Sequence, residues 1–122
     1  MAAPPRVPRI LVVEDQMLIA MEIVSLLEDI GCQPVGPVGR LVTAMIAATK
    51  EDFDAALLDV DLHGESVQPL ADFLAQKGVP FAFVSGFARE RLPPTLRDRP
   101  YVAKPFTHEG IKSAVAALFS AA

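Results

Sequence analysis

Tryptophan is absent from this 122-residue sequence, and cysteine and tyrosine each occur once. A single cysteine, Cys32, cannot form an intramolecular disulfide, which is consistent with a reducing compartment. No apolar stretch approaches the roughly 20 residues that a membrane-spanning helix requires, and the first residues lack the apolar core of a signal peptide. We therefore expect a cytoplasmic protein that makes no membrane contact.

Clustered positive charge is also missing from the sequence. The formal net charge is −4, and the 11 lysines and arginines form no basic run. Direct nucleic-acid binding needs clustered cations that neutralise phosphates, so we expect no direct nucleic-acid contact. The composition is otherwise that of an ordinary folded domain, with 52% hydrophobic and 21% charged residues.

The length suits one domain with one core. Three prolines fall within the first eight residues, which predicts a flexible N-terminal arm over residues 1–8. No internal repeat and no long linker divides the remainder. We therefore expect a single domain over residues 9–122.

Short apolar runs alternate with segments of helical periodicity along the chain. The runs predict buried parallel strands, and the second is expected at a sheet edge because it contains Pro34 and Pro37. Pro93 and Pro94 predict that the fourth helix is short or irregular. The expected strands are 10–13, 34–38, 55–58, 81–84 and 101–103, and the expected regular helices are 17–30, 41–50, 67–76 and 108–120.

This alternation predicts an α/β fold with a doubly wound, five-stranded parallel sheet covered by helices on both faces. The simplest strand order is 2-1-3-4-5, which is flavodoxin-like. Ligands of such sheets bind beyond the carboxyl ends of the strands. The residues that follow each strand are therefore the first place to look for a site.

Polar residues follow four of the five predicted strands: Glu14 and Asp15, Asp59, Ser85, and Lys104. These four strands are neighbours in the expected order, so we expect three acids, a hydroxyl and an ammonium at one rim. Crowded carboxylates repel each other unless cations compensate them, and oxygen ligands favour Mg²⁺ over zinc. Because Mg²⁺ shares its coordination with phosphate oxygens, the rim predicts phosphoryl chemistry with Asp59 as acceptor.

Four segments make the sequence resemble bacterial response-regulator receiver domains: Val12–Asp15, Leu57–Val60, Val84–Gly86 and Lys104–Phe106. The resemblance extends over residues 9–120. It implies a receiver fold and a two-component signalling switch that modifies only itself, rather than an enzyme with other substrates. A sensor histidine kinase or a histidine phosphotransfer protein would donate the phosphoryl group, and a downstream protein target would bind the altered surface. The domain would be a monomer or a phosphorylation-dependent dimer.

The resemblance also implies roles for the acidic residues. Asp59 would be the phospho-acceptor. Mg²⁺ would be held by Glu14, Asp15, Asp59 and the backbone carbonyl of Asp61. Because Asp61 flanks the acceptor, it should also influence how fast the acyl phosphate hydrolyses, in a direction that the sequence does not fix.

Switch residues are implied by the same resemblance. Ser85 and Lys104 would bind the phosphoryl group, and Pro105 would follow a cis peptide bond. Tyr101 occupies the position of the aromatic that swings inward as the hydroxyl moves. Phe87 flanks the acceptor, so it should tune dephosphorylation together with Asp61.

A narrower resemblance concerns the fourth strand and its surroundings. The segment 80–87, with Leu92-Pro93 and Arg99-Pro100, is similar to a subgroup of single-domain receivers common in α-proteobacteria. That subgroup carries a Phe-Ala-Thr-Gly-like segment, where this chain has Val84 and Ser85 in place of Ala and Thr. Ser85 keeps the hydroxyl, so the chemistry should be retained.

Each of these residues also has an ordinary structural role available to it. Asp15 alone could cap the first helix, Asp59 alone could be a turn residue, and Tyr101 alone could be core. His63 follows the third strand, where it could affect access to the phosphate or simply be solvated. The joint placement of the strand-end residues favours the receiver interpretation.

Two other functions fit parts of the sequence. A receiver fold could act as a phosphorylation-independent interaction module, although retention of all five site positions argues against this. A small Mg²⁺-dependent phosphatase would use Asp59 as nucleophile and Asp61, two residues on, as acid–base. The absence of a cap domain within 122 residues argues against the phosphatase.

Overall fold

The computed structural model describes residues 7–87 and 89–120. The flexible arm expected over residues 1–8 falls mostly outside this range. Within the range, the carbonyl of Pro8 accepts a hydrogen bond from the backbone N–H of Gln33 (2.8 Å). Pairing between the first two strands therefore begins at Pro8.

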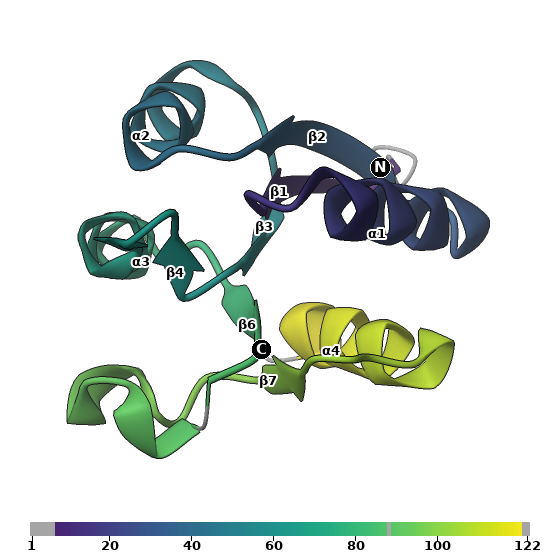
Figure 1. Cartoon of the computed structure of the whole chain (residues 1–122). Helices are drawn as coiled ribbons and strands as arrows, with labels where there is room; N and C mark the ends of the chain where they lie inside the picture. The colour runs from purple at the N-terminus through teal and green to yellow at the C-terminus, as the bar shows by residue number, and fades with distance from the viewer. Residues whose placement is uncertain (1–6, 88, 121–122) are drawn as a thin grey trace.

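Five parallel strands form the central sheet (Figure 1). Their order is β2-β1-β3-β6-β7, which in chain order is 2-1-3-4-5 and confirms the expected flavodoxin-like topology. The edge strand β2 contains both Pro34 and Pro37, in accord with the absence of a second neighbour that would need their amides. The strands are β1 (Arg9–Val13), β2 (Gln33–Val38), β3 (Ala55–Leu58), β6 (Phe81–Ser85) and β7 (Tyr101–Ala103).

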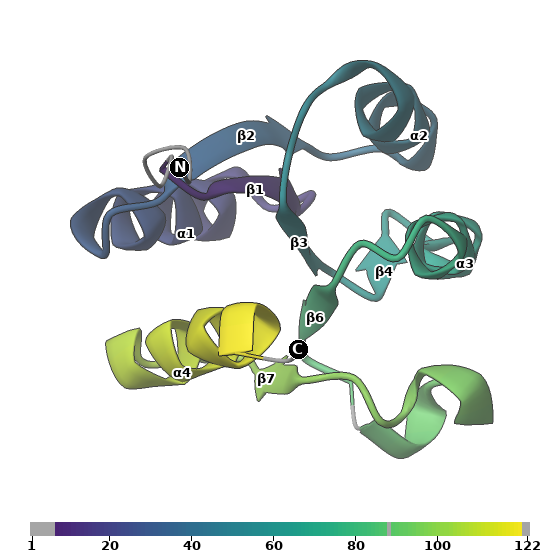
Figure 2. The same ribbon diagram turned by 180° about the vertical axis from the view of Figure 1, so that it is seen from behind.

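Four α-helices cover the two faces of the sheet: α1 (Met17–Asp29), α2 (Leu41–Lys50), α3 (Gln68–Gln76) and α4 (His108–Ser120). Figures 1 and 2 show α1 and α4 on one face and α2 and α3 on the other. Successive side chains of a strand point to opposite faces. Ile10 and Val12 therefore pack beneath α1 and α4, whereas Leu11 and Val13 pack beneath α2 and α3.

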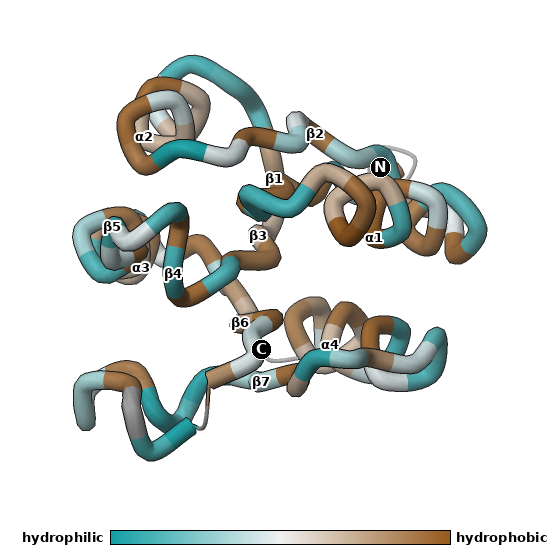
Figure 3. The backbone as a smooth tube through the Cα atoms, viewed as in Figure 1, coloured by the Kyte–Doolittle hydropathy of each residue, from teal (hydrophilic) through white to brown (hydrophobic). Residues whose placement is uncertain are grey.

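The hydropathy of the chain follows these layers. In Figure 3 the central strands are largely brown, whereas the connection from β1 to α1 is teal. Polar residues thus gather where the buried strands end. Within the described residues, no helix is long and apolar enough to span a membrane.

The structure agrees with the expected elements except for one short hairpin and small shifts of element ends. Two 3₁₀ turns, η1 (Arg89–Arg91) and η2 (Pro94–Leu96), replace a fourth regular helix, as Pro93 and Pro94 led us to expect. A short antiparallel hairpin, β4 (Asp61–Leu62) with β5 (Glu65–Ser66), was not predicted. The remaining differences are one-residue shifts of element ends, of which the addition of Ser85 to β6 matters most.

Leu96 anchors the 3₁₀ segment in the core, since it is buried in the same cluster as Phe83. We expect Leu96→Ala to lower the free energy of unfolding by about 2–4 kcal/mol, because it removes buried methyl groups and leaves a cavity. Urea denaturation provides the measurement. Thr95→Ala, at an exposed neighbouring position, is the matched control and should change the free energy by less than about 0.5 kcal/mol. Equal effects of the two substitutions would contradict the anchoring role.

Candidate functional site

Three carboxylates meet at the carboxyl ends of β1 and β3. Asp59 directly follows β3, and its backbone N–H donates to the carbonyl of Val13 at the end of β1 (2.9 Å). One carboxylate oxygen from each of Glu14, Asp15 and Asp59 lies within 4.8 Å of the other two. This acidic cluster could hold a metal ion, as the positions of the strand ends predicted.

An open hollow of about 340 Å³ exposes the acidic cluster. A second hollow of about 270 Å³ adjoins it towards the β4–β5 hairpin, and the two share Asp61 and Phe87. Asp61, at the start of the hairpin, and Phe87 therefore lie where the two hollows meet. The first hollow is lined by Asp15, Gln16, Asp59, Asp61, Gly86, Phe87 and Lys104.

Lys104 compensates part of the negative charge. Its Nζ lies 2.7 Å from Oε1 of Glu14 and 3.2 Å from Oδ2 of Asp59. Burial would lower the pKa of Lys104, but hydrogen bonding to Glu14 and the charges of both carboxylates outweigh burial and raise it. The ammonium therefore stays charged. The peptide bond that joins Lys104 to Pro105 is cis, as the resemblance implied.

Asp59 remains electrostatically strained despite Lys104. Burial and then the nearby charge of Glu14 raise the pKa of Asp59 from 3.8 to about 7, whereas Lys104 and the amide of Asp61 lower it. The side chain is 8% exposed, so water does little to screen the repulsion. Additional positive charge at this point would return the carboxyl to its ionised form.

Asp15 is prepared to bind a cation. Its Oδ2 accepts a hydrogen bond from the backbone N–H of His63 (3.0 Å), but its Oδ1 is buried with no hydrogen-bond partner among the described residues. Burial raises the pKa of Asp15, yet the bonds to His63, Glu14 and Asp59 outweigh burial and lower it. A buried, ionised and unpaired oxygen fits a metal ligand. The helix-capping alternative is not what the structure shows, because Gln16 is the N-cap of α1.

The β4–β5 hairpin contributes contacts that the sequence analysis missed. His63 lies in its turn with a positive φ of 51°, which aims its amide at Asp15. The His63 ring also approaches Asp15, with Nδ1 3.6 Å from Oδ2. The only signal in the sequence was Gly64 after His63, a pair that favours a tight turn.

Asp61 lies beside the acceptor. Its backbone N–H donates to Oδ1 of Asp59 (3.3 Å), and its side chain is half-buried. This arrangement places the residue where the predicted metal ligand should be. The role of its carbonyl as a ligand stays a prediction.

Ser85 and Phe87 form the opposite wall. Ser85 is fully buried, and its hydroxyl oxygen accepts a hydrogen bond from the backbone N–H of Phe87 (3.1 Å). The Phe87 side chain is 37% exposed at the mouth of both hollows. The hydroxyl is therefore held by its own loop and forms no hydrogen bond with Asp59.

Tyr101 does not line the hollow at Asp59. Its ring is half-buried against the core, and its hydroxyl is buried without a hydrogen-bond partner among the described residues. The Arg89 guanidinium carbon lies 5.6 Å from the centre of the ring. A buried hydroxyl without a partner is costly, so this ring position is one that a modest change could alter.

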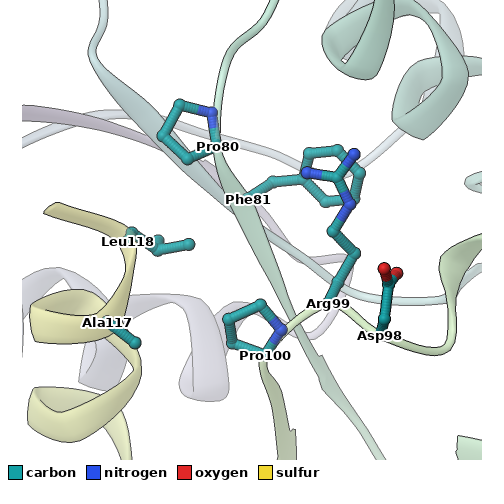
Figure 4. Close-up of a pocket in the computed structure, with 7 residues that line it drawn as sticks. All are labelled: Pro80, Phe81, Asp98, Arg99, Pro100, Ala117 and Leu118. Atoms are coloured by element: carbon teal, nitrogen blue, oxygen red, sulfur yellow. The ribbon is translucent and has the colours of Figure 1, made fainter. Parts of the chain in front are cut away.

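Another hollow, of about 230 Å³, lies at the opposite ends of the strands (Figure 4). Its floor is apolar, and the Arg99 guanidinium carbon lies 4.3 Å from the centre of the Phe81 ring. Asp98 is its single acid. It therefore lacks the crowded acids that mark the rim near Asp59. The chemistry of the chain belongs at the rim.

The raised pKa of Asp59 predicts how pH affects the metal-free protein. A folded-state pKa above the unfolded value stabilises the fold at low pH, and this stability is lost as pH rises from 3.8 to about 7. In a chelator, Asp59→Asn should therefore increase the free energy of unfolding at pH 8 by about 1–3 kcal/mol. The gain should shrink towards pH 4. Denaturation across this pH range measures it, and a gain that is equal at both ends would contradict the electrostatic explanation.

Comparisons with known proteins agree with this geometry. SdrG from Sphingomonas melonis Fr1 has 40% sequence identity and a TM-score of 0.83, and the match covers 93% of this chain and 97% of that chain. The BeF3-activated conformation of SdrG from Pseudomonas melonis Fr1 has 40% identity and a TM-score of 0.78, over 90% of this chain and 94% of that chain. No protein-family model and no curated protein sequence matches the chain.

A third similar structure is the response-regulator REC domain of PhyR from Erythrobacter litoralis. It has 28% identity and a TM-score of 0.82, and the match covers 94% of this chain and 92% of that chain. The similarities to SdrG and to PhyR extend over nearly the whole chain. The chain belongs to the family of response-regulator receiver domains, with a signalling role.

Proposed function

We propose that Asp59 accepts a phosphoryl group with the help of Mg²⁺, and that the modification changes a surface that a protein partner binds. One observation carries the proposal. Asp59 opens into a hollow with Glu14 and Asp15 at metal-ligand spacing and Lys104 against its Oδ2. A nucleophile, a candidate metal site and a cation thus meet at one point.

The donor set supports Mg²⁺ as the cofactor. The cluster offers carboxylate oxygens only, with no cysteine and no histidine among its three members, and such hard ligands suit Mg²⁺. Glu14, Asp15 and Asp59 would hold the ion together with the carbonyl of Asp61. When bound, it supplies positive charge that keeps the carboxylates ionised and offsets the charge of the phosphoryl oxygens.

Phosphoryl transfer places clear demands on Asp59 and Lys104. An ionised oxygen of Asp59 attacks the phosphorus of a phosphohistidine, the phosphorus–nitrogen bond breaks, and the imidazole nitrogen keeps the electron pair and takes up a proton. An acyl phosphate results. Lys104 already lies 3.2 Å from Asp59, so its ammonium can stabilise the transferred charge without a large movement.

Hydrolysis reverses the modification. Water attacks the phosphorus, inorganic phosphate leaves, and the Asp59 carboxylate is restored. Asp61 and Phe87 line the approach to this bond, so we propose that they tune the lifetime of the acyl phosphate. They act by admitting, orienting or excluding the attacking water.

The switch would begin at Ser85. Its hydroxyl oxygen accepts from the Phe87 amide, so its own O–H is available to donate to a phosphoryl oxygen. Tyr101 would then repack. Converting a 1:99 population into 99:1 takes about 5.5 kcal/mol of differential stabilisation. Charge-assisted hydrogen bonds from Ser85 and Lys104 can provide it only if they form in one state alone.

The surface beside the hollow suits a protein phosphodonor. Gln16 lines the hollow, and the α1 residues that follow expose large apolar side chains: Met17 by 67%, Leu18 by 86% and Met21 by 52%. Exposed apolar side chains at the mouth of a site favour protein contact. We propose that a histidine kinase or phosphotransfer protein docks here, in the cytoplasm, and that a downstream protein reads the modified state.

The phosphatase alternative depends on Asp61 as an acid–base group. Its side chain does line the hollow next to Asp59, so the idea has a geometric basis. It requires turnover of external phosphoesters, which the switch does not. A phosphorylation-independent module, in turn, requires that partner binding does not depend on Asp59 or its phosphorylation.

Intact-mass measurement tests the switch. In Mg²⁺ and acetyl phosphate, the wild type should gain one phosphoryl group that survives for minutes, because Asp59 has a cation at its side and ligands for another. Asp59→Asn should gain none. Asp61→Asn keeps the acceptor and serves as a matched acidic control, which should still be phosphorylated with an altered lifetime.

Other outcomes of this experiment would separate the alternatives. If the wild type gains no phosphoryl group and also does not respond to beryllofluoride, the proposed phosphorylation switch is contradicted. Repeated release of phosphate from an external phosphoester, at a rate that depends on Asp61, would favour the phosphatase. Partner binding unchanged in Asp59→Asn would favour the constitutive module.

The docking surface on α1 has a separate test. Leu18→Glu adds a charge to the most exposed apolar side chain, so it should slow phosphotransfer from a phosphorylated histidine protein by about tenfold or more. Phosphorylation by acetyl phosphate should be unchanged. Val42→Glu, which alters an exposed apolar residue of α2 on the other face, is the control. Equal slowing in both variants would contradict docking on α1.

A further inference from the structure

The segment between β6 and β7 is held by an unusual set of bonds. The 3₁₀ turn η1 precedes Pro93, and Pro94 is the first residue of η2. In a regular helix the carbonyls of Arg89 and Glu90 would accept from the amides four residues on, at positions 93 and 94. Both of those residues are prolines and have no N–H to donate.

Arg97 supplies donors that the prolines lack. Its Nη2 donates to the carbonyl of Glu90 (2.9 Å), and its Nε donates to the carbonyl of Leu92 (2.8 Å). The rigid fork of a guanidinium suits such paired acceptors. A side chain from beyond η2 thus ties back to η1 and takes the place of a helical hydrogen bond.

Arg89 extends this network to the switch aromatic. Its Nη1 donates to the carbonyl of Arg97 (3.3 Å), and its guanidinium carbon lies 5.6 Å from the centre of the Tyr101 ring. The carbonyl of Arg89 also accepts from the amide of Leu92 (3.0 Å). Any movement of Arg97 therefore changes what lies over Tyr101.

The other end of the segment touches the phosphorylation site. The backbone N–H of Phe87 donates to the Ser85 hydroxyl (3.1 Å). In the proposed function, this hydroxyl binds the phosphoryl group. Residues 87–101 thus run from the switch hydroxyl, through the bonds of Arg97, to the switch aromatic. Among the described residues of this stretch, 3₁₀ turns take the place of a regular helix.

We propose that Arg97 is a positioning residue: by binding the carbonyls of Glu90 and Leu92 it fixes Arg89 over Tyr101 and sets the resting position of that ring. The inference deepens the proposed function, on which its regulatory meaning rests. Arg97 forms no hydrogen bond or ion pair with Asp59 or with the proposed metal ligands. Its effect passes through Arg89 and Tyr101.

The composition provides a specific probe. Tyr101 is the only tyrosine and the sequence has no tryptophan, so tyrosine fluorescence reports this ring alone. The test variant is Arg97→Gln. The matched control is Arg99→Gln, which removes the same charge two residues away from an arginine that lies over Phe81 instead. Arg97→Lys keeps the charge but loses the forked guanidinium, so it should restore the wild-type Tyr101 fluorescence only in part.

The resting protein gives the first measurement. Arg97→Gln should shift the Tyr101 emission intensity and speed amide exchange at Leu92 and Leu96 by about tenfold, since a charge-assisted tie between the turns is gone. Arg99→Gln should leave both close to wild type. Arg89→Gln should shift the emission as Arg97→Gln does, with less effect on exchange. Unfolding curves confirm that each variant is folded under the conditions used.

Phosphorylation gives the second measurement. Acetyl phosphate with Mg²⁺ should change Tyr101 emission in the wild type and in Arg99→Gln. In Arg97→Gln this change should fall to about half or less while the phosphoryl group is still gained at Asp59, because the ring no longer starts from a fixed position. A normal gain of mass with a reduced optical response is the signature of a positioning role.

The two proposals fail in different ways. If Arg97→Gln matches Arg99→Gln in resting emission and amide exchange, the positioning role is wrong whether or not Asp59 is phosphorylated. If the wild type gains no phosphoryl group, the proposed switch is wrong. The positioning role of Arg97 is then still tested by the measurements on the unphosphorylated protein. Equal optical responses of the two variants to phosphorylation would contradict the regulatory part of the inference.

Discussion

Electrostatic repulsion among Glu14, Asp15 and Asp59 is the constraint on which this structure depends. A fold that places three carboxylate oxygens within 4.8 Å of one another is destabilised by them unless cations are present. Lys104 supplies one cation, bound to Glu14 and Asp59. Burial and the charge of Glu14 nevertheless raise the pKa of Asp59 to about 7. The remaining repulsion is what a divalent ion and a phosphoryl group can exploit.

The parallel sheet explains why these groups meet. The residues 10–13 of β1, all of β3 and the residues 81–84 of β6 are apolar and buried, so the next polar residue of each falls at the carboxyl end of its strand. Because the strands run in one direction, all such residues reach the same rim. The buried Ser85 and the loop of Lys104 complete a site that no single segment of the sequence contains.

Much of this arrangement could be predicted from the sequence because it follows from periodicity. Apolar runs located the five strands, and the polar residues after them located Asp59 and Lys104. The strand order followed from the alternation of strands and helices. Pro93 and Pro94 correctly indicated the loss of a regular helix, since neither can donate an amide.

The features that the sequence did not predict depend on contacts that produce no periodic pattern in the sequence. The bond from the His63 amide to Asp15 requires a left-handed backbone at His63, which the residue type does not favour strongly. The bonds of Arg97 join a side chain to carbonyls five and seven residues earlier, and arginine is common on any surface. The absence of a bond between Ser85 and Asp59 in the resting state likewise depends on the geometry of the Phe87 loop.

The central claim concerns one covalent bond, and chemical trapping tests it most directly. Borohydride reduces an aspartyl phosphate to homoserine, so treatment of the phosphorylated protein marks the acceptor permanently. Peptide mass spectrometry should then find a homoserine at position 59 and no modification at Asp15 or Asp61, the other acids of the rim. A homoserine at either of those positions, or none anywhere in a phosphorylated sample, would contradict the account.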